Sequence, residues 1–255
     1  MNIVTLGSGH VATQLSKALY SLGHEIQQVY SKTSANACAL AEVLSANYTS
    51  DLTTISRDAD LYIIAVSDQA IDSIVSQLPN NLPGIIVHCS GATSSAVLDK
   101  FSHYGVIYPA QSIRKDIEIH LDQIPFAVEA SDQQTARVLM ENMKRLSPST
   151  FTCSSAQRLA LHTAAVFANN FSNALFQISY DILQAHELPF ELLRPMILET
   201  AKKVQNHKPS SVQTGPALRG DSLTIEKHLQ FLSENPQWLK IYQQLTEEIS
   251  SQREK

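Results

Sequence analysis

Residues 3–12, Ile-Val-Thr-Leu-Gly-Ser-Gly-His-Val-Ala, join a short apolar run to a glycine-rich turn. Apolar residues then recur at helical spacing at Leu15, Leu19 and Leu22, and Gly23 ends the pattern. A strand, a Gly-x-Gly-x-x-Ala turn and a helix in this order hold the pyrophosphate of a dinucleotide at the helix N-terminus. We therefore predict that Gly7, Ser8, Gly9, His10 and Val11 bind such a cofactor. The alternative is an ordinary strand–helix turn without a ligand.

The composition is that of an ordinary globular protein. The chain has 255 residues, of which 44% are hydrophobic and 17% charged, and this length favours two domains. A net charge of -5 gives no reason to expect nucleic acid or an anionic membrane as a partner. Three cysteines without Cys-x-x-Cys spacing indicate neither a disulfide framework nor a metal site. Because Met1 leads directly into the first strand, we expect no signal peptide and a soluble, cytoplasmic protein.

Strand-like and helix-like segments alternate through the first 150 residues or so. Short apolar runs suggest strands, and amphipathic stretches between several of them suggest helices. The expected strands are residues 3–6, 26–30, 61–66, 85–88, 106–108 and 126–129. Such alternation predicts an α/β fold with a doubly wound parallel sheet of the Rossmann type.

The pattern changes near Cys153. From Ala156 to about Ala185 there is no glycine or proline, and apolar residues occur all round the expected helix. This predicts a long helix buried on most sides, by its own domain or by a partner subunit. Further helices follow, so we predict a Rossmann domain over residues 1–154 and an all-α domain over residues 155–255.

The end of the second expected strand distinguishes between the two nicotinamide dinucleotides. A protein that binds NAD is expected to have Asp or Glu about 20 residues after the glycine turn, hydrogen bonded to the ribose 2′-hydroxyl. This chain has Ser31, Lys32 and Thr33 there instead. A cation with two hydroxyl groups suits a 2′-phosphate, so we predict NADP. The alternative for Lys32 is a solvated loop residue.

Further motifs follow the other expected strands and one lies near the C-terminus. The motifs are Ser31-Lys32-Thr33, Ala65-Val66-Ser67-Asp68, His88-Cys89-Ser90-Gly91-Ala92, Tyr108-Pro109-Ala110-Gln111 and Thr214-Gly215-Pro216-Ala217-Leu218-Arg219-Gly220-Asp221. With them, the whole chain resembles bacterial Rossmann-like proteins that have a helical C-terminal domain of unknown function and are grouped with NADP oxidoreductases. This group is related to pyrroline-5-carboxylate reductases and to the 6-phosphogluconate and β-hydroxyacid dehydrogenases. The resemblance implies an NADP-binding fold and a homodimer formed through the C-terminal helices.

In open α/β sheets, ligands bind at the carboxyl ends of the strands, where these motifs fall. We expect Val66, Ser67, Asp68 and Ile71 to contact the cofactor, with Ser67 and Asp68 beside its adenosine half. Ser90 and Gly91 are expected nearer the nicotinamide, and the alternative for them is a simple turn at the end of a strand.

Hydride transfer needs a proton donor and groups that hold the substrate. The candidate catalytic residues are His162, Asn169, Asn170, Ser90, Tyr108 and Arg219. His162 and Asn169 are seven residues apart, which is nearly the same face of an α-helix. Hydroxyacid relatives have a catalytic Lys and an Asn on the equivalent helix, but this chain has no Lys there. Members of the resembled group also typically have His-Pro where this chain has Tyr108-Pro109.

Each candidate has a structural alternative. The alternative for His162 is a structural residue held by hydrogen bonds. The alternative for Asn169 and Asn170 is a pair of side chains that hydrogen bond one helix to another. Arg219 suits a substrate carboxylate, but it equally suits a pair with Asp221 or a helix cap. Tyr108 is either a proton donor, a ring stacked on the cofactor or a packing residue.

These observations favour an NADP-dependent oxidoreductase. It would transfer a hydride between nicotinamide and a small carbonyl, imine or hydroxyacid substrate bound between the domains. The alternative is a non-catalytic NADP-binding dimer that acts as a redox sensor or regulatory protein.

Overall fold

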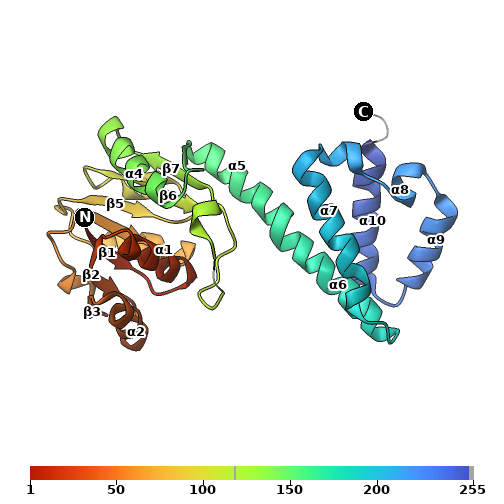
Figure 1. Ribbon diagram of the computed structural model, residues 1–255, viewed down its shortest axis with the longest axis horizontal. Coiled ribbons are helices and arrows are strands. Elements are labelled where there is room, and N and C mark those ends of the chain that lie inside the picture. The colour runs from red at the N-terminus through yellow and green to blue at the C-terminus, as the bar shows by residue number, and fades with distance from the viewer. Residues whose placement is uncertain (118, 253–255) are drawn as a thin grey trace. The chain divides into compact units, whose positions relative to one another are not determined.

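A computed structural model describes residues 1–117 and 119–252 of the protein (Figure 1). The chain divides into two compact units, Met1–Asn170 and Phe171–Lys255. The helix that follows Cys153 therefore begins within the first unit. The domain boundary predicted between residues 154 and 155 stays a prediction.

The first unit is built on one sheet of eight strands in the order β3-β2-β1-β4-β5-β6-β7-β8. The strands are β1 (Asn2–Leu6), β2 (Glu25–Tyr30), β3 (Asn47–Thr49), β4 (Leu61–Ile64), β5 (Ile85–His88), β6 (Tyr104–Pro109), β7 (Phe126–Ala130) and β8 (Phe151–Thr152). All neighbours are parallel except β6 and β7. The strand order reverses beside β1, so the carboxyl ends of β1 and β4 border a crevice suited to a ligand.

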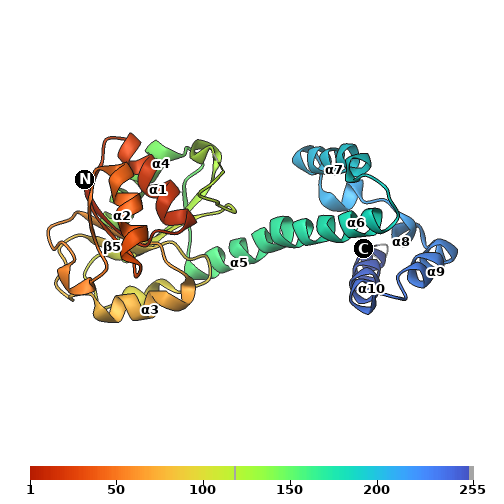
Figure 2. The same cartoon turned by 90° about the horizontal axis from the view of Figure 1, so that it is seen from below.

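Helices cover both faces of this sheet (Figure 2). They are α1 (His10–Ser21), α2 (Ser34–Leu44), α3 (Asp68–Gln77) and α4 (Gln133–Leu146). One core cluster joins α1, α2 and α4 to Leu61 and Ile63 of β4, and the other joins α3 to Tyr62 and Ile64 of the same strand. Alternate residues of β4 therefore enter opposite cores, which explains why its sequence is an unbroken apolar run.

The doubly wound α/β fold is confirmed, but its sheet is not purely parallel. β7 runs antiparallel to β6, and β8 is parallel to β7. A parallel neighbour would need a long crossover, usually a helix. Between Pro109 and Phe126, the described residues contain only the short 3-10 turn Leu121–Gln123. The chain therefore returns beside β6 in the opposite direction.

The expected long helix is present, but its middle is wound differently. α5 (Ser155–Ala165) passes through a π-helical segment, Val166–Phe171, into α6 (Ser172–Ala185). Leu159 is 48% exposed and Phe167 is 65% exposed. The first unit therefore does not bury this helix on most sides, and cover by a partner subunit stays a prediction.

The second unit consists of helices. After α6 come α7 (Arg194–Asn206), α8 (Pro216–Arg219), α9 (Ser222–Phe231) and α10 (Pro236–Ser251). In the part of the chain that the structure describes, no helix combines the length and apolar character needed to cross a lipid bilayer.

Candidate cofactor site and active site

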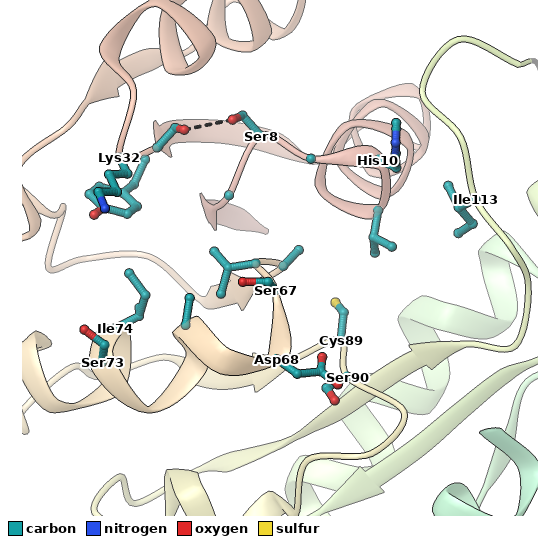
Figure 3. Close-up of a pocket in the computed structure, with 18 of the residues that line it drawn as sticks. Ser8, His10, Lys32, Ser67, Asp68, Ser73, Ile74, Cys89, Ser90 and Ile113 are labelled. Carbon is teal, nitrogen blue, oxygen red and sulfur yellow. Dashed lines mark hydrogen bonds between the residues drawn. The ribbon is translucent and has the colours of Figure 1, made fainter. Parts of the chain in front are cut away.

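A cavity of about 860 Å³ opens at the carboxyl ends of β1, β2, β4 and β5 (Figure 3). Most residues predicted to bind the cofactor or act in catalysis line it: Gly7, Ser8, Gly9, His10, Val11, Ser31, Lys32, Val66, Ser67, Asp68, Ser90, Gly91, Tyr108 and His162. Residues that the sequence did not indicate also contribute, among them Ser73, Ile74 and Gln77 of α3. The first unit alone therefore brings the predicted cofactor motifs together.

The glycine turn has the geometry that the sequence predicts. Gly7 has a φ of +134°, and its N–H donates to the carbonyl oxygen of Tyr30 at 2.8 Å. A Cβ at Gly7 would clash with the carbonyl of Ala65, whereas one at Gly9 would meet no atom of the described chain within 4 Å. Open space thus lies in front of the start of α1, and its N-cap residue, Gly9, makes no side-chain hydrogen bond to the first turn. The first N–H groups of an α-helix lack partners within the helix and fit a pyrophosphate.

Hydroxyl groups and a cation lie at the end of β2. The Ser8 hydroxyl donates to Ser31 Oγ at 2.8 Å, and exposed Lys32 follows on the cavity wall (Figure 3). Asp68 is the only acidic side chain among the described lining residues. Asp68 lies beside Ser90 and across the cavity from Lys32, as Figure 3 shows. The Lys32 end of the cavity is thus free of nearby carboxylates among its described lining residues and fits a 2′-phosphate.

Two residues predicted to contact the cofactor do not line the cavity, and their contacts stay predictions. Ile71 is 1% exposed and packs in the core beneath α3, because this position faces the sheet. Thr33 precedes the first residue of α2 and is not among the lining residues. A segment that the sequence did not indicate approaches instead. Ile113 lines the cavity, and the Lys115 N–H donates to His10 Nδ1 at 3.0 Å.

The turn after β5 packs directly against α5. The Ser90 hydroxyl oxygen accepts hydrogen bonds from the backbone N–H groups of Ala92 and Thr93, at 3.1 and 2.9 Å. A Cβ at Gly91 would lie 2.6 Å from His162 Cγ and Nδ1. Glycine is therefore required here for the imidazole to approach the backbone.

We predict that Gly91→Ala lowers the free energy of unfolding by about 1–3 kcal/mol, because the added methyl group overpacks the contact with His162. Urea unfolding measures the loss. In a His162→Ala background the same substitution is expected to cost less, since the clashing ring is gone and only the contact with the Cβ of residue 162, at 2.9 Å, remains. Equal losses in the two backgrounds would contradict the assigned contact.

Arg158 holds this turn, and the sequence did not indicate it. Its side chain on α5 is 1% exposed. One terminal nitrogen donates to the carbonyl oxygens of Ser90, Gly91 and Thr93 at 2.8–3.1 Å, and the other lies 3.0 Å from the Glu129 carboxylate. Hydrogen bonds from Ser95, Ser155 and Arg158 outweigh the effect of burial and lower the pKa of Glu129. The pair is thus ionised and fixes the wall of the cavity near Ser90.

His88, at the end of β5, is fully buried behind the same turn. Its Nδ1 accepts a hydrogen bond from the Ser90 N–H at 3.1 Å. Burial lowers the pKa of His88 from 6.5 to about 4, and the charge of Arg158 acts in the same direction. The imidazole is therefore neutral in the folded protein near neutral pH.

This low pKa predicts a loss of stability in acid. Below pH 6.5 the unfolded chain gains a proton at His88 that the folded protein does not take up until about pH 4. The stabilisation is thus present above pH 6.5 and falls on acidification, by about 2.5 kcal/mol between pH 7 and pH 4.5. Urea unfolding of the wild type and of His88→Gln at both pH values measures it, because the variant lacks this term. Parallel losses in the two proteins would show that His88 titrates normally.

Tyr108 and His162 meet on the cavity wall. The tyrosine hydroxyl lies 3.0 Å from His162 Nδ1, and the rings meet edge to face. Burial raises the pKa of Tyr108, against a smaller opposite effect of Arg158, so the phenol is protonated near neutral pH. Both residues also line a second cavity of about 390 Å³, which therefore adjoins the first.

Asn169 and Asn170 both line this second cavity and are exposed. They lie in the π-helical segment, where each turn contains one residue more than an α-helical turn. The residue on the same helix face as His162 therefore shifts from position 169 toward position 170. The seven-residue spacing that holds for an α-helix does not apply to this segment. Such π-helical segments are frequent at functional sites.

Arg219 belongs to the second unit and is not among the lining residues of either cavity. Its motif forms turns and caps. Pro216 begins α8, Gly220 ends it with a φ of +72°, and Asp221 caps α9 by accepting from the Thr224 N–H at 3.1 Å. The catalytic role predicted for Arg219 stays a prediction.

Two family models match the sequence. Residues 2–90 match the family described as "NADP oxidoreductase coenzyme F420-dependent", and residues 124–249 match a domain of unknown function, DUF2520. No curated protein matches the sequence.

Solved structures resemble the whole chain. A "putative NADP oxidoreductase" from Bacteroides fragilis is 37% identical, with a TM-score of 0.88 and 98% of each chain covered. A pyrroline-5-carboxylate reductase from Streptococcus pyogenes is 16% identical, with a TM-score of 0.66 and 98% of each chain covered. An imine reductase from Myxococcus stipitatus in complex with NADP⁺ is 17% identical, with a TM-score of 0.65, covering 100% of this chain and 93% of the other. The latter two show the fold alone. The predicted cofactor, NADP, is confirmed at the level of the family.

Proposed function

The chain belongs to the family of Rossmann-fold proteins that join an NADP oxidoreductase domain to DUF2520, and on this premise we propose that it transfers a hydride between NADP and a small carbonyl, imine or hydroxyacid. One observation supports the proposal most. The hydrogen-bonded pair Tyr108 and His162 lies on the wall shared by the cofactor cavity and the adjoining cavity. A proton donor is thus next to the position where a substrate would meet the cofactor.

The residues of the glycine turn, with Ser31 and Lys32, would hold NADP through its phosphates, and the bound nicotinamide supplies the hydride. In the direction of reduction, Tyr108 gives its hydroxyl proton to the substrate oxygen or nitrogen. His162 then passes its Nδ1 proton to the phenolic oxygen across the 3.0 Å contact while its Nε2 takes up a proton from solvent, so the imidazole is neutral before and after the step. Arg158 holds the Ser90–Thr93 backbone in place, so the wall against which the substrate lies does not move.

The test is a screen of carbonyl, imine and hydroxyacid compounds by the absorbance of NADPH. Tyr108→Phe and His162→Gln are expected to lower kcat at least 100-fold, the usual contribution of a general acid, while NADPH binds as before. Tyr104→Phe is the matched control, because Tyr104 lies on the same strand and lines neither cavity. Undiminished turnover in both test variants would remove the pair from the mechanism. Tight NADPH binding without turnover of any compound would favour the redox sensor.

We also propose that the protein is a cytoplasmic homodimer formed through its C-terminal helices. Ala217 and Leu232 are the only hydrophobic side chains buried to more than nine-tenths among the described residues of the second unit. In contrast, Leu192, Met196 and Leu223 are 61%, 65% and 71% exposed. Apolar side chains exposed to this degree on several helices favour cover by another surface, and a second copy provides a matching one. Sedimentation equilibrium gives the number of subunits.

A further inference from the structure

The cavity that adjoins the cofactor site is polar but carries no fixed charge. Apart from Tyr108 and His162, its polar lining consists of Gln111, Ser112, Asn169 and Asn170. Amide and hydroxyl groups both donate and accept hydrogen bonds. They can therefore satisfy a ketone, ester, amide, hydroxyl or imine group of a ligand without any ionic partner.

A substrate carboxylate would need a cation, and no lysine or arginine is among the described residues that line this cavity. Both terminal nitrogens of Arg158 are bound to backbone carbonyls and Glu129. Arg114 pairs with Asp116 at 2.6 Å. Lys32 lies on the cofactor cavity, at the end of β2, and does not line the adjoining one (Figure 3).

Asp68 is the acidic side chain among the described residues that line the cofactor cavity. It lies on the side of the cavity where Ser90 is, as Figure 3 shows. A carboxylate repels an acidic substrate and attracts a protonated imine. Transfer of an acid from water into this region would therefore cost free energy without a compensating ion pair.

From this we infer that the substrate is a ketone or imine without a carboxylate, and that its non-reacting end hydrogen bonds to the amides of Gln111, Asn169 and Asn170. The inference rests on the proposed function and narrows it, since it excludes hydroxyacids from the three proposed substrate classes. It assigns the adjoining cavity as the site that selects the substrate.

The experiment compares compounds that differ only in the acid group, with the full-length protein loaded with NADP⁺. Hexanamide and hexanoate serve as non-reacting probes, and calorimetry gives their dissociation constants. We expect the amide to bind at least ten times more tightly. Equal or tighter binding of hexanoate, or no binding of either probe, would overturn the inference.

A turnover assay with NADPH tests the inference separately from the reductase function on which it rests. It compares two pairs of compounds: 1-pyrroline with 1-pyrroline-5-carboxylate, and ethyl 5-oxohexanoate with 5-oxohexanoate. Preference for the neutral member of each pair supports the inference. Preference for the acids overturns the inference and leaves the reductase function intact. If Arg219→Leu then loses that preference, Arg219 is the cation that binds the carboxylate. Turnover of no compound contradicts the reductase function alone, because the binding comparison still decides the inference.

A variant that adds a cation to the cavity is expected to bind the acid more tightly. Gln111→Lys is expected to tighten hexanoate binding at least tenfold, because Gln111 is exposed and lines the cavity. Gln134→Lys is the matched control, since Gln134 is exposed on α4 and lines neither cavity. Unchanged hexanoate binding in Gln111→Lys would overturn the assignment of this cavity.

Discussion

Replacement of Arg158 by leucine is expected to lower the free energy of unfolding by about 3–5 kcal/mol. The guanidinium is 1% exposed, and its removal leaves the Glu129 carboxylate, 15% exposed, without its cation. The carbonyls of Ser90, Gly91 and Thr93 lose their shared donor at the same time. Urea unfolding of the two proteins at pH 7 measures the difference.

Two further variants make the result specific. Arg137→Leu is the matched control, because Arg137 is exposed on α4 and its loss is expected to change stability by no more than about 0.5 kcal/mol. The double variant Arg158→Leu/Glu129→Leu is expected to recover part of the loss, since no unpaired charge is then buried. A loss below about 1 kcal/mol in Arg158→Leu would show that the ion pair does not hold the turn.

Lys32→Glu is expected to weaken NADPH binding about 100-fold and to leave NADH binding nearly unchanged. The substitution removes a charge-assisted hydrogen bond of about 1.5–3 kcal/mol and places a carboxylate beside the expected 2′-phosphate. Lys32 is exposed, so the fold should tolerate the change. Fluorescence titration with each cofactor gives the two dissociation constants.

Lys144→Glu makes the same change of charge on α4, away from the cavity, and serves as the control. It separates an effect of overall charge from one at the phosphate. If wild-type protein binds NADPH and NADH equally well, or if the control weakens NADPH as much as Lys32→Glu does, Lys32 does not select the cofactor.

Much of the first unit could be predicted because its signals are local. Ile3–Leu6, Gly7 and Gly9 form their strand and turn from residues adjacent in the chain, and the structure has them as expected. Ile71 shows the limit of the same reasoning. It stands next to cavity residues in the sequence, but the rotation of α3 directs it into the core.

The residues that sequence reasoning missed act over long separations. Arg158 contacts a turn more than 60 residues earlier in the chain, and nothing in its neighbours distinguishes it from an ordinary charged residue in the first turn of a helix. The Ser154–Gln157 capping box was readable and marks where that helix starts. It does not indicate that the next side chain is buried, because burial depends on the packing of α5 against the sheet.

The sequence by itself determined the Rossmann fold, the glycine turn and the choice of NADP, since each depends on residues close together in the chain. Only the tertiary structure decided that Tyr108 hydrogen bonds to His162 and that Gly91 makes room for that imidazole. It also decided that Arg158 holds the turn that contains Gly91. Those contacts join strand ends to a helix more than 50 residues later. Their geometry follows from how the helix packs on the sheet, which no local pattern encodes.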